Sequence, residues 1–246
     1  MTQNTLIVSN WKMNLDLTNA KKLIYKLKKI RNIKKTTKNI ICPQFLLIPT
    51  VSELIKNSNI ILGAQDCHYN ESGSFTGDSS ISLIQKYRCK YVIIGHSERR
   101  INHCEKDEIV KKKIILAKKF KISAIVCVGE PLEIRKKKNH ISFILNQLDR
   151  CIPANLDEII IAYEPIWSIG SGKTPTLENI LEIKTLSINF LKEKKKIKTI
   201  SFLYGGSVNS KNLYEIINKS SLNGALIGGA SLVEKEIVNI LKTNFN

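Results

Sequence analysis

The sequence lacks the features that mark a membrane-spanning or exported chain. None of the apolar segments in its 246 residues approaches the roughly 20 residues needed to cross a bilayer. The first residues, MTQNTLIVSNWKMN, contain no basic leader and only a short apolar run, so they do not resemble a signal peptide. We therefore expect a cytoplasmic protein with no membrane partner.

Close pairs of cysteines are also missing. The six cysteines are Cys42, Cys67, Cys89, Cys104, Cys127 and Cys151, and none of them forms a CxxC pair. Metal sites and redox motifs favour closer spacing than this. We expect free thiols in a reducing compartment, and no metal site.

Acidic residues are scarce relative to basic ones. The chain has 39 Lys or Arg against 21 Asp or Glu, a net charge of +18, and its pI is near 9.6. This balance would suit a nucleic-acid-binding protein, which is the alternative from another class. The lysines stand in runs such as 111–119 and 192–198, and no aromatic–basic RNA motif or zinc-finger spacing accompanies them. We expect weak, nonspecific contact at most, and no nucleic-acid partner in the main function.

What the sequence does have is a regular series of short apolar runs. Eight of them are rich in β-branched residues: 6–8, 40–42, 60–62, 91–94, 124–128, 159–162, 200–204 and 225–227. Helical patterns lie between most of them, such as one from Leu17 to Ile30 with Thr18 as a candidate cap. This alternation, unbroken by any linker, predicts parallel strands joined by right-handed crossovers. We expect one α/β domain, residues 1–246, folded as a closed (β/α)8 barrel.

Polar residues and glycines collect where these runs end. They are Asn10-Trp11-Lys12, Gln65-Asp66, His96-Ser97-Glu98-Arg99, Gly129-Glu130, Glu164, Gly205-Gly206-Ser207 and Gly228-Gly229. Taken alone, Lys12 could be a surface lysine, His96 a structural histidine, and Glu98 with Arg99 an ion pair. The carboxyl ends of the strands carry the active site in barrels of this type, so one shared site explains all of them together.

The stretch Ala162–Thr176, AYEPIWSIGSGKTPT, is the most informative of these. Glu164 ends a buried strand, and Ile166 and Trp167 give the following loop an apolar underside. Gly170 and Gly172 permit backbone angles that other residues avoid. A carboxylate under a closable flap can act as a general base shielded from water, although a surface Glu in a turn would fit this segment equally well.

Part of the same stretch has a misleading likeness to a phosphate-binding P-loop. Gly172-Lys173-Thr174 matches the end of that motif, but Trp167 stands where the motif needs its first glycine. Pro175 would also break the helix that must follow. We do not expect nucleotide hydrolysis.

In their order along the chain, these motifs resemble the triosephosphate isomerase family. The matching segments are NWKMN at 10–14, GAQ at 63–65, GSFTGD at 73–78, IGHSERR at 94–100, CVGE at 127–130, AYEPIWSIGSGKTPT, YGGSV at 204–208 and GALIGGASL at 224–232. The resemblance implies a TIM barrel that interconverts dihydroxyacetone phosphate and glyceraldehyde 3-phosphate through an enediolate, in glycolysis and gluconeogenesis. It implies no cofactor and no metal. Another phosphate-binding barrel, acting on a different sugar phosphate, is the nearest alternative.

The resemblance also implies roles for individual residues. Glu164 would be the base, with its pKa raised by burial under the flap. His96 would be a neutral electrophile just ahead of a helix that begins near Ser97, where the helix dipole disfavours imidazolium. Lys12 would neutralise the phosphate and the developing oxyanion. Glu98 would either organise Lys12 and His96 or have a purely structural role.

Substrate binding falls to a second set of residues in this resemblance. They are Asn10, Lys12, Gly170, Ser207, Gly228 and Gly229. Asn10 would position Lys12, and the others would offer backbone N–H groups to the phosphate, partly from the start of a short helix.

The segment Gly73–Asp78 predicts an assembly. Its small residues surround a single aromatic, Phe75, so the segment as a whole is a poor candidate for packing on its own barrel. In the family this loop enters a neighbouring subunit, and Thr76 matches the residue that reaches the partner's site, where it would brace Asn10 and Lys12. We expect a two-fold homodimer.

The chain departs from the family pattern at a few positions. Lys121 stands where a helix-ending glycine is usual, Asp66 where asparagine is common, and Pro131 where threonine is usual. A left-handed backbone at Lys121 would cost about 1 kcal/mol. These differences bear on stability and loop detail and leave the expected reaction unchanged.

Overall fold

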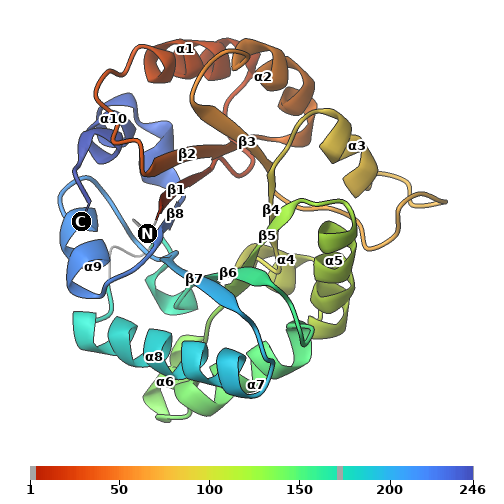
Figure 1. Cartoon of the computed structure of the whole chain (residues 1–246), viewed down its shortest axis with the longest axis vertical. Helices are drawn as coiled ribbons and strands as arrows, with labels where there is room; N and C mark the ends of the chain where they lie inside the picture. The colour runs from red at the N-terminus through yellow and green to blue at the C-terminus, as the bar shows by residue number, and fades with distance from the viewer. Residues whose placement is uncertain (1–3, 171–173, 246) are drawn as a thin grey trace.

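A computed structural model describes residues 4–170 and 174–245 and places the eight expected strands in one closed parallel barrel (Figure 1). The strands are β1 (Thr5–Asn10), β2 (Thr37–Cys42), β3 (Ile60–Ala64), β4 (Tyr91–Ile94), β5 (Ser123–Val128), β6 (Glu158–Tyr163), β7 (Thr199–Tyr204) and β8 (Gly224–Ile227). They follow one another in sequence order, and β1 pairs with both β2 and β8. The (β/α)8 TIM barrel is thus confirmed, with most strands slightly longer than predicted.

Helices cover the outside of the barrel (Figure 1). The α-helices are α1 (Leu17–Lys28), α2 (Ile48–Leu54), α3 (Ile81–Lys86), α4 (Ser97–Asn102), α5 (Asp107–Lys119), α6 (Leu132–Lys136), α7 (His140–Cys151), α8 (Leu177–Glu193), α9 (Leu213–Lys219) and α10 (Glu234–Lys242). Short 3₁₀ helices are η1 (Phe45–Leu47), η2 (Ile166–Ser168) and η3 (Gly229–Leu232). No helix in the described part of the chain is long and apolar enough to cross a membrane. The cysteines are free thiols, as expected.

Alternation along the strands determines which side chains reach the mouth of the barrel. Leu6 and Val8 of β1, and Ile160 and Ala162 of β6, belong to the apolar cluster inside the barrel. Successive side chains of a strand point to opposite faces, so the same parity carries Asn10 and Glu164 inward at the carboxyl ends. The strand period alone therefore aims an amide and a carboxylate at one point.

The start of α1 differs from the prediction. The cap is Asp16, whose Oδ1 accepts a hydrogen bond from the Asn19 N–H at 2.7 Å, and Thr18 lies inside the helix. Both residues are good caps, but the cap must precede the helix with an extended backbone, and Asp16 has φ −76° and ψ 175°. The prediction of Thr18 as the cap was wrong by two residues.

The end of α5 confirms the suspected strain at Lys121. This residue has φ +54°, in the left-handed region that favours glycine. The Ile122 N–H donates to the Ala117 carbonyl and the Lys121 N–H to the Lys118 carbonyl, which is the Schellman pattern of a helix end. The turn requires the left-handed backbone, so the side chain at Lys121 carries its steric cost.

Lys121→Gly is therefore expected to stabilise the protein by about 1 kcal/mol, because glycine adopts this backbone without the clash. In a chain of this length the melting temperature should rise by about 2–4 °C, measurable by calorimetry. Lys118→Gly, inside the last turn of the same helix, is the matched control and should lower it. A fall in melting temperature for Lys121→Gly would contradict the assignment of strain.

Candidate active site

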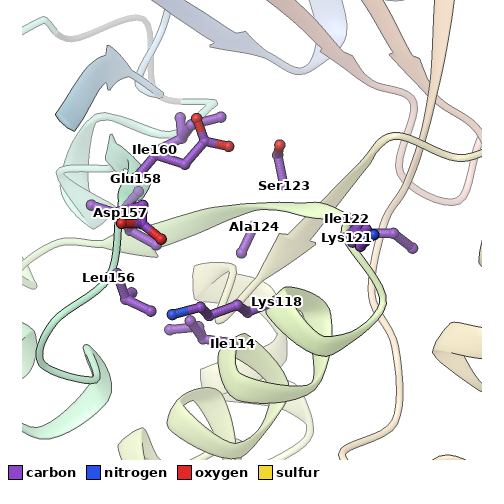
Figure 2. A pocket seen from close by; sticks show the side chains of 11 residues that line it. Ile114, Lys118, Lys121, Ile122, Ser123, Ala124, Leu156, Asp157, Glu158 and Ile160 are labelled. Carbon is purple, nitrogen blue, oxygen red and sulfur yellow. The ribbon is translucent and has the colours of Figure 1, made fainter. Parts of the chain in front are cut away.

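A cavity of about 290 Å³ opens at the carboxyl ends of the strands, and all eight predicted site residues line it. They are Asn10, Lys12, His96, Glu164, Gly170, Ser207, Gly228 and Gly229. A second cavity of about 310 Å³ lies between the end of α5 and the first residues of β5 and β6, and none of the predicted site residues lines it (Figure 2). The structure therefore brings together residues spread over most of the chain into one mouth.

Glu164 is the most enclosed charged group of this cavity. Its Oε1 lies 3.1 Å from His96 Nε2, and its Oε2 accepts a hydrogen bond from the Ser97 N–H at 3.2 Å. Two glycines give it space, since a Cβ on Gly205 would lie 2.8 Å from Glu164 Cγ and one on Gly129 would overlap the Glu164 carbonyl. The alternative of a surface Glu in a turn is excluded, because Glu164 is only 2 % exposed.

The pKa of Glu164 moves in the opposite direction to the prediction. Burial alone would raise the pKa, but the facing His96, the Ser97 N–H and the Cys127 side chain outweigh burial and hold the pKa below its usual range. The sequence indicated the burial but not the direct contact with His96. In this arrangement the carboxylate is therefore stabilised in its charged form, which is the form a base needs.

His96 stands at the N-cap of α4, as predicted. Its Nδ1 accepts a hydrogen bond from the Glu98 N–H at 3.2 Å, so the proton of the neutral ring lies on Nε2, facing the cavity. Burial would lower the pKa of His96, but the charges of Glu164 and Glu98 outweigh it and raise the pKa. The helix start thus fixes the tautomer, whereas the expected suppression of imidazolium is overcome by the neighbouring carboxylates.

Lys12 is held by contacts on three sides. Its Nζ donates to Glu98 Oε1 at 2.6 Å, its backbone N–H donates to Asn10 Oδ1 at 3.0 Å, and its carbonyl accepts from Gln65 Nε2 at 2.8 Å. Its backbone is left-handed, with φ +50°. A lysine in this rare conformation points to local constraint, and the three contacts identify what imposes it.

Glu98 lies between the two predicted catalytic groups it was expected to organise. Its Oε1 accepts from Lys12, and its Oε2 lies 3.6 Å from His96 Nδ1. The alternative, an ion pair between Glu98 and Arg99, is wrong, because Arg99 Nε lies 2.8 Å from both Asp66 Oδ2 and Glu105 Oε2.

Glycines and small residues make up the side of the cavity near β7 and β8. A Cβ on Gly229 would meet no atom within 4 Å, and one on Gly228 would lie 3.4 Å from Lys12 Cε. The predicted short helix is present as η3, and the first N–H groups of a helix have no partner inside it. Ser207 is fixed by donating from Oγ to the Ser168 carbonyl. This wall can therefore present backbone N–H groups to an anion beside Lys12.

The first part of the loop after β6 is anchored on a buried carboxylate. Glu130 is fully buried and accepts hydrogen bonds from Tyr163 OH at 3.1 Å and from Trp167 Nε1 at 3.0 Å. Gly170 lies further along the loop with φ +66°, a backbone conformation that suits glycine. The predicted Gly172 and Lys173 lie outside the described residues.

Sequence reasoning missed several contacts near the site. Lys113 belongs to a lysine run interpreted as an outer helix face, yet it is buried, with Nζ 2.7 Å from Asp66 Oδ1 and 2.9 Å from Glu105 Oε2. Together with Arg99, these residues tie the strand end after β3 to the helix that begins at Ser97. The signal that could have found Lys113 is its position in α5 on the same face as Val110 and Ala117.

We searched the described residues, 4–170 and 174–245, for a metal site. No group of three or more His, Cys, Asp or Glu side chains in these ranges could hold a metal ion. Among the described residues, the ionisable groups that line the cavity are a carboxylate, an imidazole and an ammonium from distant parts of the sequence.

This fold and site together define a class of protein. A carboxylate in contact with a histidine can move protons, and a lysine beside glycine N–H groups can hold a small anion. The chain is thus a (β/α)8 barrel whose mouth carries the groups that proton transfer on an anionic substrate would need.

Comparison with known proteins identifies the particular family. The family model described as triosephosphate isomerase matches residues 5–244. The triosephosphate isomerase of Borrelia garinii is 40% identical over 248 residues, covering 97% of this chain and 98% of the relative. That of Thermoanaerobacter pseudethanolicus is 39% identical over 244 residues, covering 96% and 98%. The crystal structure of the Bartonella henselae triosephosphate isomerase superposes with a TM-score of 0.87 at 33% identity, covering 96% of this chain and 97% of that one.

The chain therefore belongs to the triosephosphate isomerase family. Its activity is that of a triose-phosphate isomerase, the interconversion of dihydroxyacetone phosphate and glyceraldehyde 3-phosphate in glycolysis.

Proposed function

We propose that Glu164, His96 and Lys12 carry out this reaction as base, electrophile and cation. The observation that carries the proposal is the 3.1 Å contact between Glu164 Oε1 and His96 Nε2 in a cavity that Lys12 also lines. A base and a proton donor that touch each other can both reach a substrate of three carbons.

The steps follow from these positions. Glu164 removes a proton from the carbon beside the carbonyl and returns it to the neighbouring carbon. His96 donates from Nε2 to one oxygen of the enediolate and recovers a proton from the other. Lys12, oriented by Asn10 and Glu98, neutralises negative charge on the enediolate and the phosphate. A glutamate base working with a histidine electrophile is the established pattern of this enzyme family, so that division of roles is inherited from the family.

The phosphate is proposed to lie against Gly228, Gly229, Ser207 and Gly170. Two observations support this position of the phosphate. These residues line the cavity together with Lys12, and barrels of this type recurrently bind phosphate beside their last two strands. A crystal complex with 2-phosphoglycolate tests this, and an anion found elsewhere would refute it.

A coupled isomerase assay tests the reaction itself. The purified chain should convert glyceraldehyde 3-phosphate without added cofactor and in the presence of EDTA, because the proposed groups are all side chains and backbone. Activity that depended on an added metal or cofactor, or that preferred another sugar phosphate, would refute the assignment of these residues.

The wider setting is proposed from the sequence expectations. The whole chain, 1–246, works as one barrel domain in the cytoplasm, in gluconeogenesis as well as glycolysis. The pairing of β1 with β8 supports one domain, since it joins the two ends of the chain in a single sheet.

A homodimer is proposed from the exposed apolar residues on one side of the mouth. Met13, Leu46, Phe75 and Ile101 are 89%, 90%, 36% and 61% exposed and all lie in the first four strand–helix units. The connection from β3 to α3, which contains Phe75, projects from the barrel (Figure 1). An apolar group of this kind, beside a projecting loop, is typical of a surface that a partner covers.

Thr76→Arg is expected to give poorly active monomers, because a charged side chain at the loop tip would not fit the neighbouring subunit. Sedimentation should find the wild type near twice 27.9 kDa and the variant near the single-chain mass. Thr76→Ser is the matched control and should stay dimeric. A fully active wild-type monomer at micromolar concentration would refute the homodimer.

A further inference from the structure

The connections between helices and strands carry most of their positive charge at the end of the barrel opposite the mouth. The seven connections that lead from a helix to the next strand contain twelve Lys or Arg and one acidic residue, Asp157. By sequence, the eight connections that lead from a strand to the next helix contain three Lys and six Asp or Glu. In a parallel barrel these two sets lie at opposite ends, so the charge of the connections is strongly polarised along the barrel axis.

We call the seven helix-to-strand connections the basic face. Eleven of its twelve cations are exposed. Nine of the twelve form no salt bridge with any residue in the described part of the chain; the exceptions are Lys56, Lys195 and Lys198. Most of this charge is therefore available to an external anion.

The cations are spread around the barrel. The connection from α1 to β2 has four of them and the connection from α8 to β7 another four, and these helices lie on opposite sides of the ring (Figure 1). The side between α5 and β6 is the less basic part, because Asp157 and Glu158 line its cavity together with Lys118 and Lys121 (Figure 2). The connections from α7 to β6 and from α9 to β8 contain no Lys or Arg, so the charge lies mainly on two opposite sides of this end. Charge on two opposite sides of one end of a barrel suits a flat partner better than a narrow one.

We propose that the basic face adsorbs to the surface of a bilayer that contains anionic lipids. Each lysine or arginine near such a surface makes a favourable contribution to the free energy of binding, provided that it lies within a Debye length of about 8 Å of the lipid headgroups. A plane brings both sides of the ring within that distance together, whereas a nucleic-acid rod would contact a strip. Single-stranded nucleic acid is further disfavoured because Tyr87 is the one exposed aromatic in these connections, and such binding uses stacking platforms.

This contact is peripheral and needs no spanning helix. It departs from the expectation of no membrane partner, which rested on the sequence without the placement of its charges. Adsorption through the basic face points the mouth away from the lipid, and the proposed dimer surface also lies on the mouth side. The bound enzyme therefore keeps an open active site and remains active.

Vesicle co-sedimentation of the full chain tests the proposal. Binding is expected to vesicles of phosphatidylglycerol mixed with phosphatidylcholine and not to phosphatidylcholine alone, and salt should reverse it. Two double variants reverse charge on opposite sides of the ring: Lys29→Glu with Lys35→Glu, and Lys194→Glu with Lys196→Glu. Each should weaken binding by at least about tenfold while leaving isomerase activity unchanged.

The matched control is Lys136→Glu with Lys137→Glu, which makes the same charge change at the end of α6, outside the basic face. It should weaken binding much less than either test variant. Equal losses in all three variants would mean that net charge alone acts, and would overturn the proposal. Tight binding of duplex DNA or RNA with no binding to anionic vesicles would overturn it in favour of a nucleic-acid surface.

Discussion

Glu164→Asp is expected to lower kcat by about a hundredfold or more while the affinity for 2-phosphoglycolate is retained. The shorter side chain keeps the charge but withdraws the carboxylate by about 1 Å, and a misplacement of that size costs about two orders of magnitude. The position cannot adjust freely, because Gly129 and Gly205 lie against the Glu164 backbone and side chain, and the Ser97 N–H holds one oxygen. Steady-state kinetics with the coupled assay measures the effect.

The same substitution at an exposed site provides the control. Glu133→Asp in α6 removes one methylene from a carboxylate on the surface and should leave kcat and KM unchanged. Undiminished turnover in Glu164→Asp would defeat the assignment of the base. Loss of inhibitor affinity together with turnover would instead indicate that Glu164 holds the site together.

The sequence predicted most of the site because two simple periods govern it. The strand period of two puts Asn10 and Glu164 inside the barrel, and the repeated strand–helix unit brings the carboxyl ends to one mouth. Neither step depends on long-range detail. The family resemblance then singled out eight residues at the strand ends or in the segments that follow them, and all eight line one cavity.

Side-chain pairing was less predictable, because it depends on distances between elements that the sequence does not contain. Arg99 follows Glu98 in sequence, yet it pairs with Asp66 and Glu105, since consecutive residues of a helix point in different directions. The direction of the Glu164 pKa failed for a related reason. The sequence predicted that Glu164 would be buried, which raises its pKa. It did not predict the contact with His96, which helps to lower the pKa by more than burial raises it.

The position of the lysines in the fold could not be predicted from the sequence for a different reason. The lysine runs suggested outer faces of helices, but four of the lysines between residues 194 and 198 stand in a connection, and Lys113 is buried. Residues are assigned to one face of a helix by the spacing between apolar and polar positions, and a run of consecutive lysines has no such spacing. Only the ends of the elements reveal that the charge gathers at one end of the barrel.

Lys12→Ala is expected to lower kcat/KM by about a thousandfold or more. Loss of a single preorganised donor to a developing oxyanion costs about 10²–10³ in rate, and Lys12 would serve the phosphate as well. Its removal also leaves Glu98, whose carboxylate lies 2.6 Å from Lys12 Nζ, without its partner beside the cavity. The substrate dianion would then meet a negative charge where it had met a positive one.

This second effect makes the prediction separable from a simple loss of folding. In Lys12→Ala with Glu98→Gln, the repulsion is removed while the ammonium is still missing, so KM should recover in part and kcat should stay low. Lys12→Arg keeps the charge but replaces a compact ammonium with a planar fork, and should retain some binding with poor turnover. Thermal melting of each variant checks the fold. Nearly normal kcat/KM in Lys12→Ala would remove Lys12 from the mechanism, and would leave Gly228, Gly229 and Ser207 to hold the phosphate through backbone groups alone.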